Sequence, residues 1–307
     1  MSRHTAGEKM ETKRDILLKM IAISGELPSY LTGIVVGSPS YAASLVTALK
    51  KDGYIHIRSK DGVRGYILSK KGKTYLLNHY ETDMRDYLTG ASETNHVKSE
   101  KEKRLRLHRM SLAWTHFFLQ GCIIFSSEKP EIFSESFFRQ KETGTYYGSQ
   151  ELKGGTDKIK GSRACGLFIK KGKAFVVYQT MENLLKWAKK TEHAMRAWVE
   201  GKALRHNLSW GSDAIFLGNS MAFLLQILES TGGIKNQLFQ VDETYEHYYY
   251  IPCFSTPSFI QTDLIVDGKT TKHFKKFLYT MLDEVEDREF SVYAGYQKQR
   301  RVYFWYE

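Results

Sequence analysis

The segment 38–68 constrains the fold of this chain more than any other stretch. Ser38 is a favourable N-cap residue, and Pro39 suits the first position of a helix, where no N–H donor is needed. Apolar residues then recur at helical spacing, and Gly53 can end the helix in a left-handed turn. Two short apolar runs follow, one on each side of Asp61-Gly62, which is the pattern of a β-hairpin. We therefore expect a helix followed directly by a two-stranded hairpin.

A helix that leads into a basic hairpin is the core of a winged helix-turn-helix, in which the helix can enter a DNA major groove while the hairpin lies along the phosphates. Around this core, an apolar stripe over 16–21 predicts a first helix, 27–35 can hold a short second helix, and 75–77 belongs to a closing helix. The run DGYI…YILSKKGKTYLL resembles the strand–wing–helix segment of many winged-helix DNA-binding proteins. We expect a winged helix-turn-helix over residues 1–80.

Charge is concentrated in the same part of the chain. The whole sequence has a net charge of +11, and residues 1–80 carry 13 Lys and Arg against 6 Asp and Glu, a net charge of +7. A basic domain of this kind favours a polyanion, so double-stranded DNA is the expected partner. Two alternatives stay open at this point: a merely basic solvated surface, and a winged helix that serves as a protein interface.

Specific residues can be assigned to a DNA contact. The outward positions of the helix carry hydroxyls that reach phosphates or base edges, but no Arg or Asn for bidentate base contacts. A homo-oligomer on repeated sites would compensate for this weak readout. The hairpin offers better phosphate contacts. A basic helix predicted over 98–121 adds two arginines that could contact phosphates; the alternative interpretation of its charges is a helix face exposed only to solvent. The predicted DNA-binding residues are Ser38, Ser40, Tyr41, Ser44, Thr47, Lys50, Lys51, Arg58, Lys60, Arg64, Arg104 and Arg106.

The rest of the chain predicts a second domain. Residues 81–100 are polar with weak periodicity and are expected to form a linker, and 101–307 alternate helix and strand patterns. The fold class is therefore α+β: an N-terminal winged helix followed by an α/β domain with a central mixed sheet. Within that domain we expect a hairpin over 166–169 and 174–178, a helix over 181–200, and strands over 213–218, 248–251 and 262–266.

The order helix, hairpin, long helix, strand resembles the core of restriction-endonuclease-like (PD-(D/E)XK) domains. A winged helix, a basic helix and such a core together resemble the replication-relaxation proteins of plasmids and conjugative elements, and the residues that carry this likeness lie at 105–110, 162–168 and 175–180. The resemblance implies a DNA-binding protein of a mobile genetic element, which acts in plasmid replication, relaxation or conjugative transfer together with replication or relaxation proteins.

The nuclease signature itself is missing at the expected positions. Ala164-Cys165 stands where the pattern has Pro-Asp, and Tyr178-Gln179-Thr180 stands where it has Glu-x-Lys. Mg²⁺ requires hard oxygen ligands, which Cys and Tyr do not replace. Nothing in the sequence places Asp157, Glu182 and Asp213 in one cleft. We therefore predict no catalytic residues, no metal and an inactive nuclease fold. The alternatives are a DNA-nicking or DNA-cleaving nuclease or relaxase, and a transcription regulator with a sensor domain.

The remaining sequence features bear on the cellular location and on cofactors. The three cysteines are widely spaced without a CxxC pair, so disulfides and zinc sites are not expected and a reducing, cytoplasmic location fits. The sequence has no apolar run long enough to cross a bilayer and no signal-peptide core at its start, so no membrane contact is expected. Neither GxxxxGK[ST] nor GxGxxG occurs, which indicates no nucleotide cofactor.

Overall fold

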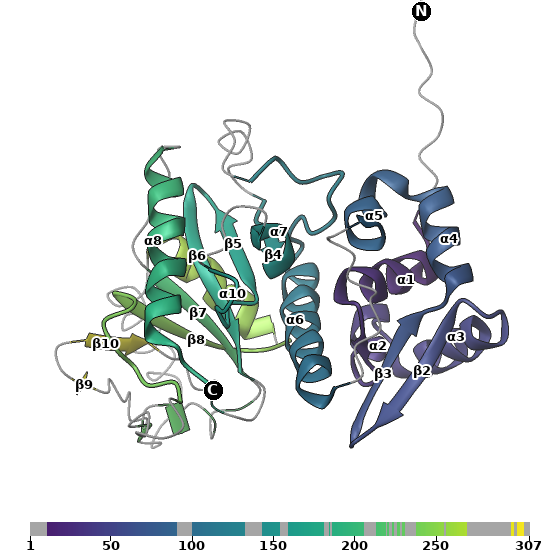
Figure 1. The fold of residues 1–307 in the computed structure, drawn as a ribbon, viewed down its shortest axis with the longest axis horizontal. Coiled ribbons are helices and arrows are strands. Elements are labelled where there is room, and N and C mark those ends of the chain that lie inside the picture. The colour runs from purple at the N-terminus through teal and green to yellow at the C-terminus, as the bar shows by residue number, and fades with distance from the viewer. Residues whose placement is uncertain are drawn as a thin grey trace, which may run out of the picture. The chain divides into compact units, whose positions relative to one another are not determined.

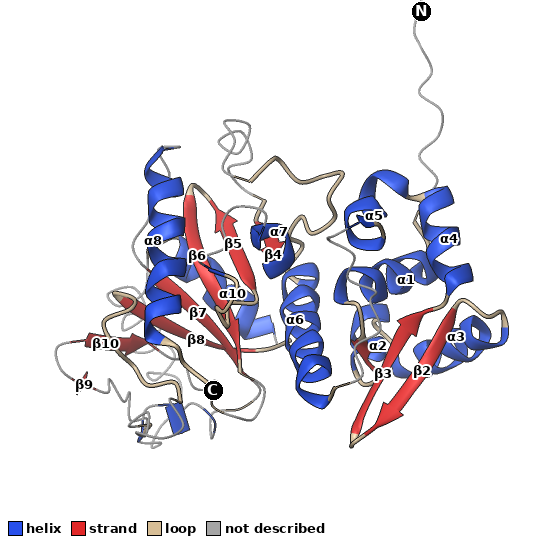
Figure 2. Cartoon of the chain, in the orientation of Figure 1, coloured by secondary structure: helices blue, strands red, loops and turns tan. Residues whose placement is uncertain are grey.

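The structure, a computed structural model, forms two compact units, Met1–Ser111 and Leu112–Glu307. Both units combine helices and strands, and each is described by itself (Figures 1 and 2). The structure describes residues 11–90, 100–132, 143–153, 159–180, 184, 186–205, 213–218, 220, 223, 226–227, 229–230, 238–254, 256–268, 296–297 and 300–303. Among these residues, no helix combines the length and the apolar character that a bilayer crossing requires.

The first unit begins with three helices whose ends follow from local sequence. Helix α1 (Lys13–Ser24) starts at a capping box in which Thr12 and Asp15 bond each other's backbone N–H groups. Helix α2 (Leu31–Val36) leads to α3 (Pro39–Lys51). The Ser38 side chain accepts a hydrogen bond from the Tyr41 N–H at 3.4 Å, and Gly53 follows α3 with a φ of 75°. The predicted start and left-handed end of this helix are confirmed.

A three-stranded antiparallel sheet completes the core of this unit. Strands β2 (Ile55–Lys60) and β3 (Val63–Leu68) pair over six residues each. The turn between them has positive φ at both residues, 54° at Asp61 and 75° at Gly62, the combination of a type I′ hairpin. Strand β1 (Leu27–Pro28) pairs with β3, so the sheet order is β1-β3-β2. The sequence did not predict β1, because its two residues are too few to show a strand pattern.

Two further helices follow the hairpin: α4 (Lys70–His79) is the predicted closing helix, and α5 (Glu81–Leu88) extends the unit beyond the predicted boundary at residue 80, where we expected a linker. The hydroxyl of Tyr75 donates to Asp15 at 2.8 Å, and the buried ammonium of Lys19 pairs with Asp83. These contacts attach α4 and α5 to α1. The unit then continues into the first part of α6 (Lys101–Leu119), as far as Ser111.

The second unit is built around a mixed sheet. Five strands lie side by side in chain order, and β10 and β9 extend the sheet beyond β8. The pairs β4–β5 and β5–β6 are antiparallel. The pairs β6–β7, β7–β8 and β8–β10 are parallel, and β9 is antiparallel to β10. This arrangement confirms the expected hairpin and central mixed sheet. The strands are β4 (Thr145–Gly148), β5 (Gly166–Lys170), β6 (Lys173–Gln179), β7 (Asp213–Gly218), β8 (His247–Pro252), β9 (Tyr296–Gln297) and β10 (Arg300–Tyr303).

Helices cover both faces of this sheet. Successive side chains of a strand point to opposite faces. Tyr178 belongs to the face that packs against Met195 and Val199 of α8 (Lys189–Arg205). On the opposite face, the ring of Phe117 from the end of α6 stacks on Phe168, with ring centroids 4.7 Å apart. The short helix α7 (Ser149–Lys153) follows β4, and α10 (Thr256–Val266) follows β8.

Two predicted elements of this unit differ from the structure. The helix expected over 181–200 begins only at Lys189, and its buried side runs through Glu192, Met195 and Val199. The strand expected over 262–266 is the second half of α10. A short apolar run such as Leu264-Ile265-Val266 has no periodicity that distinguishes a strand from a buried helix.

Candidate nucleic-acid interface

One side of α3 is open to solvent and carries the predicted contacts. Ser40, Tyr41, Ser44 and Thr47 are exposed, and Tyr41 retains 51% of its accessible surface. Lys50 and Lys51 in the last turn are exposed as well, whereas Ser38 is half-buried as the N-cap. The structure therefore brings these positions together on one helix, as the apolar spacing predicted.

The hydroxyls on α3 are engaged with their own helix. Ser44 donates to the carbonyl oxygen of Ser40 at 3.3 Å, and Thr47 donates to that of Ala43 at 2.9 Å. A hydroxyl that donates backwards presents its lone pairs outwards, so it must rotate before it can donate to a phosphate. These residues are therefore weak anion contacts, and cations must supply most of the attraction.

The hairpin provides such cations at its tip. Lys60 and Arg64 are exposed beside the Asp61-Gly62 turn. Arg58 differs from the prediction, because its side chain keeps only 18% of its surface and its Nη1 lies 3.9 Å from Glu26 Oε2. A largely buried guanidinium beside a carboxylate has little freedom to reach a phosphate. Arg58 is therefore a neighbour of Glu26 rather than a tip contact.

Arg104 corrects the prediction more strongly. Its side chain is fully buried, and it forms a two-pronged ion pair with Glu26, with Nη2 at 2.6 Å from Oε1 and Nε at 2.9 Å from Oε2. The same guanidinium donates to the backbone carbonyls of Arg58, Lys60 and Val63 at 3.0–3.1 Å. No donor is left to face solvent, so Arg104 cannot bind DNA. Arg106, two residues further on, is half-exposed on α6.

Glu26 is the centre of this buried cluster. His108 Nε2 lies 3.0 Å from Oε1, and Ser111 donates to the Glu26 carbonyl at 2.9 Å. Burial raises the pKa of the Glu26 carboxyl, but hydrogen bonds from His108 and Arg104 outweigh it and hold the pKa below its usual value. Glu26 is therefore ionised at neutral pH. The sequence analysis missed this cluster, since Arg104 and His108 lie 78 and 82 residues after Glu26 in the chain.

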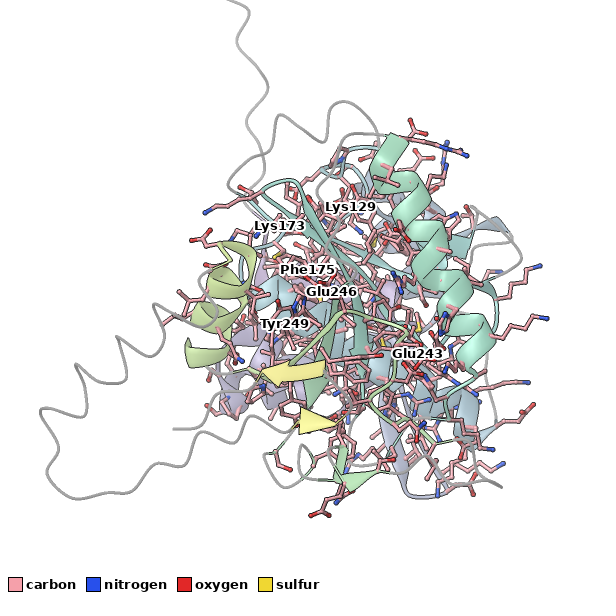
Figure 3. All side chains as sticks on the ribbon, turned by 90° about the vertical axis from the view of Figure 1, so that its left-hand side faces the viewer. Lys129, Lys173, Phe175, Glu243, Glu246 and Tyr249 are labelled. Carbon is pink, nitrogen blue, oxygen red and sulfur yellow. The ribbon has the colours of Figure 1, made fainter. Side chains whose placement is uncertain are left out.

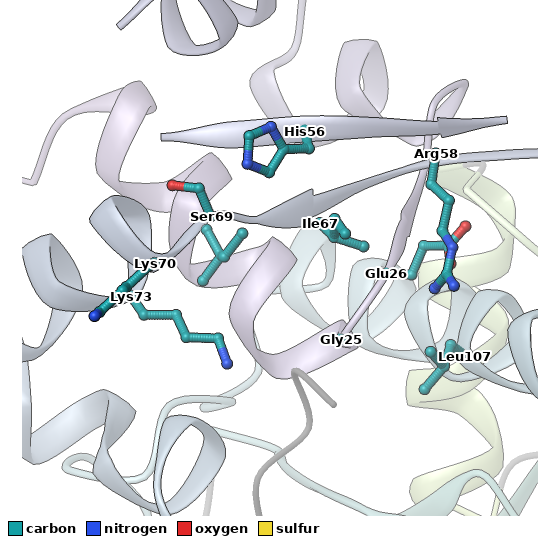
Figure 4. Close-up of a pocket in the computed structure, with 10 residues that line it drawn as sticks. Gly25, Glu26, His56, Arg58, Ile67, Ser69, Lys70, Lys73 and Leu107 are labelled. Atoms are coloured by element: carbon teal, nitrogen blue, oxygen red, sulfur yellow. The ribbon is translucent and has the colours of Figure 1, made fainter. Parts of the chain in front are cut away.

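A cavity of about 320 Å³ lies beside this cluster (Figure 4). Its walls come from the hairpin, the start of α4 and the turn after α1, and none of its lysines was predicted to contact a ligand. The run Lys70-Lys71-Gly72-Lys73 at a helix start was the available signal. The residues that line the cavity are Gly25, Glu26, His56, Arg58, Ile67, Leu68, Ser69, Lys70, Lys73 and Leu107.

In the second unit, the positions at which the sequence analysis expected the nuclease signature are buried. Cys165, Tyr178 and Gln179 retain at most 4% of their surface. The Tyr178 hydroxyl donates to Glu192 Oε2 at 2.8 Å and lies 2.7 Å from the hydroxyl of Tyr245. Burial is the largest influence on Glu192 and raises the pKa of its carboxyl, despite several hydrogen bonds that lower it. These residues form a polar bridge inside the core.

The carboxylates considered from the sequence do not join those positions. Asp213, at the start of β7, hydrogen-bonds His247 at 2.8 Å. The charges of Glu246 and Lys173, two residues that Figure 3 labels, also act on the Asp213 carboxyl. The register pairs Gln179 with Leu217, four residues along β7 from Asp213, a separation of about 13 Å. Asp157 and Glu182 lie outside the described residues.

The tyrosine run of β8 has a structural role. Tyr248, Tyr249 and Tyr250 are buried in the middle of the sheet, between β7 and β10. Tyr248 donates to Asp242 Oδ1 at 2.8 Å, and burial raises the pKa of Tyr250 to about 12. Tyrosines held in this way pack as an aromatic strand within the sheet.

Comparisons with known proteins give no match: no model of a protein family, no curated protein and no solved structure is similar to this chain.

Proposed function

We propose that the first unit is a winged helix that binds duplex DNA, with α3 in the major groove and the tip of the β2–β3 hairpin on the phosphates. The observation that carries the proposal is the element order α1-β1-α2-α3-β2-β3 with sheet order β1-β3-β2, which leaves one face of α3 and a cationic hairpin tip exposed. This is the arrangement in which a helix and a wing can contact one duplex together.

Fluorescence anisotropy with a random-sequence duplex at several salt concentrations tests this function. Each phosphate contact contributes a slope of about −0.9 to the log–log plot of affinity against salt, because binding releases counterions. Changing Lys60→Gln and Arg64→Gln together should weaken binding and reduce the slope by about 2. Lys13→Gln, an exposed lysine at the start of α1, is the matched control and should leave the slope unchanged. Binding that does not depend on salt would overturn the proposal.

For the second unit we propose a restriction-endonuclease-like core that does not cleave DNA. Its proposed role is to form the homo-oligomer that binds DNA. In support, the end of α6 is followed by β4, α7, β5, β6, α8 and β7, with β7 parallel to β6. The buried Cys165, Tyr178 and Gln179 supply no carboxylate for Mg²⁺. Supercoiled plasmid incubated with the protein and Mg²⁺ or Mn²⁺ should stay intact. Nicking that is abolished by Asp213→Asn would establish the alternative, a nuclease.

The resemblance to replication-relaxation proteins extends this proposal to a role in a mobile genetic element. The protein would bind, as a homo-oligomer, a duplex site near an origin of replication or transfer. Footprinting on such an origin, with light scattering to measure the oligomeric state, tests this part. Protection confined to a promoter would favour a transcription regulator instead.

A further inference from the structure

The tip of the β2–β3 hairpin has less support from neighbouring strands than its base. Strand β1 pairs with β3 at Tyr66 and Gly65, and Ser29 beyond it donates to the Arg64 carbonyl at 3.2 Å. Among the described residues, no third strand flanks the pair Lys60–Val63 next to the turn. A two-stranded hairpin is only marginally stable in water by itself. The position of the tip therefore depends on side chains that bind its backbone.

One guanidinium binds this backbone on both strands. Arg104 Nη1 donates to the Lys60 carbonyl at 3.0 Å, and Nη2 donates to the Val63 carbonyl at 3.0 Å. Lys60 and Val63 are the residues on either side of the Asp61-Gly62 turn. Nη2 also donates to the carbonyl of Arg58 in β2 at 3.1 Å. Arg104 thus bridges the two strands at the tip of the hairpin.

The guanidinium is itself held in place by Glu26. This residue lies in the turn between α1 and β1, and it is fully buried, as is Arg104. The Glu26 carboxylate accepts from Arg104 Nε at 2.9 Å and lies 3.0 Å from His108 Nε2, while Ser111 donates to the Glu26 carbonyl at 2.9 Å. Bonds on every side leave the guanidinium no other position. The hairpin tip is therefore attached to a fixed point inside the first unit.

We propose that Arg104 is a positioning residue for duplex binding: it holds the hairpin tip, and with it Lys60 and Arg64, in place before DNA arrives. This inference rests on the proposed function of the first unit. Arg104 itself does not touch DNA, and Glu26 is its anchor. A segment that is already ordered loses less conformational entropy when it binds. Ordering a single backbone residue on binding corresponds to about a 5- to 30-fold loss of affinity.

Hydrogen exchange of the free, full-length chain tests whether Arg104 holds the tip. The variant is Arg104→Lys, because a lysine keeps the charge and can pair with Glu26, but its ammonium cannot reach carbonyls on both strands as the planar guanidinium does. The backbone amides of residues 59–64 should exchange at least about tenfold faster in this variant, since local opening then requires less free energy.

Duplex binding tests whether that position matters for function. Arg104→Lys should lower the affinity for a random-sequence duplex at least about fivefold. The slope of affinity against salt should stay the same, because Lys60 and Arg64 still neutralise the same phosphates. This result differs from that of Lys60→Gln with Arg64→Gln, in which the slope itself should fall. A variant that removed a phosphate contact would not combine lower affinity with an unchanged slope.

Lys19→Met is the matched control, since it removes another buried ion pair of the first unit, the one with Asp83 that attaches α5 to α1. It should lower stability but leave tip exchange and duplex affinity unchanged at a temperature where circular dichroism shows every variant folded. If Arg104→Lys does not fold, Glu26→Gln replaces it, because a neutral amide at this position anchors the guanidinium more weakly. The same two effects are then expected.

The proposal requires both effects, faster exchange at the tip and weaker duplex binding. It is overturned if either is missing, or if Lys19→Met produces both to the same extent. Absence of salt-dependent duplex binding by the unchanged protein would instead overturn the proposed function, and the positioning role with it. Exchange of the tip is measured without DNA, so the two failures are distinguishable.

Discussion

At the scale of single residues, the Arg104 guanidinium is committed to five oxygen atoms of the first unit: both carboxylate oxygens of Glu26 and three carbonyls of the hairpin. Taking two charges out of water is costly, and a buried pair repays that cost only when its geometry and its hydrogen bonds are complete. Here they are complete. The guanidinium holds α6 against the tip end of the hairpin, where Lys60 and Val63 flank the turn, so its loss affects the hairpin and not only a charge.

We expect Arg104→Met to destabilise the protein by roughly 3–5 kcal/mol, because Glu26 is left buried without its main partner. Urea unfolding followed by circular dichroism measures this change. The matched control is Arg85→Met, since Arg85 pairs with Glu81 on the surface with 67% of its side chain exposed. That exposed helix pair should contribute about 0.3–0.5 kcal/mol. Equal effects of the two changes would contradict the role assigned to Arg104.

Gly65 is required by the same cluster. A Cβ atom at this position would lie 2.7 Å from the Glu26 side chain and 3.0 Å from His108 Nε2. Gly65→Ala should therefore cost roughly 1–3 kcal/mol, the usual range for overpacking. The urea midpoint measures it, and Gly201→Ala in α8 is the control, since a Cβ atom there has nothing within 4 Å and alanine should not destabilise the helix. Equal losses in the two variants would contradict crowding as the cause.

At the scale of elements, the β2–β3 hairpin depends on the conformation of its turn. A type I′ turn needs positive φ at both central residues, which glycine adopts without strain. Gly62 has nothing within 4 Å of a hypothetical Cβ, so crowding does not constrain it. Gly62 and Gly65 are thus required for different reasons, backbone conformation and close packing.

Gly62→Ala should destabilise the hairpin by about 1–2 kcal/mol, because the Cβ of alanine makes a left-handed φ sterically unfavourable. Gly62→Asn is the control, since asparagine tolerates this conformation, and it should cost less. Circular dichroism with urea measures both variants. If alanine and asparagine are equally harmful, the strain does not come from the left-handed φ.

At the scale of the whole molecule, five carboxyls of the described residues divide into two groups by the direction in which the pKa is shifted. Hydrogen bonds outweigh burial at Asp15, Glu26 and Asp242, and their pKa values lie below the usual range. Burial prevails at Glu192 and Asp213, whose pKa values are raised. The first group stabilises the folded state when ionised, and the second group costs stability when ionised.

Glu26 contributes to the pH dependence of the first unit's stability, in the same direction as Asp15. With its pKa lowered from 4.5, the folded state binds this proton less readily than the unfolded chain does. Its contribution is therefore complete above the unfolded pKa and is lost as the pH falls through the folded one. Urea midpoints measured from pH 7 down to about pH 3 should decrease, and Glu26→Gln should be less stable at pH 7 with a shallower decrease. Parallel profiles would contradict this assignment.

Much of the architecture follows from local signals in the sequence. The segment 38–68 contains its own N-cap, its left-handed glycine and its Asp-Gly turn, so α3 and the hairpin were predictable without any distant residue. The strands β5 to β8 were predicted for a similar reason, since apolar runs between turn residues indicate buried strands. These features are properties of a few neighbouring residues, which a linear sequence displays directly.

Only the tertiary structure decided which charged side chains face solvent and which are buried in ion pairs. A basic run on α6 has the same pattern whether its arginines face water or a buried carboxylate, so Arg104 was predicted as a phosphate contact and is instead the partner of Glu26. Glu192 is a second example, because its neighbours in the sequence do not indicate that its carboxylate is buried and accepts a hydrogen bond from Tyr178. A side chain's protonation and its availability depend on burial and on partners many residues away, which arise only when the chain folds.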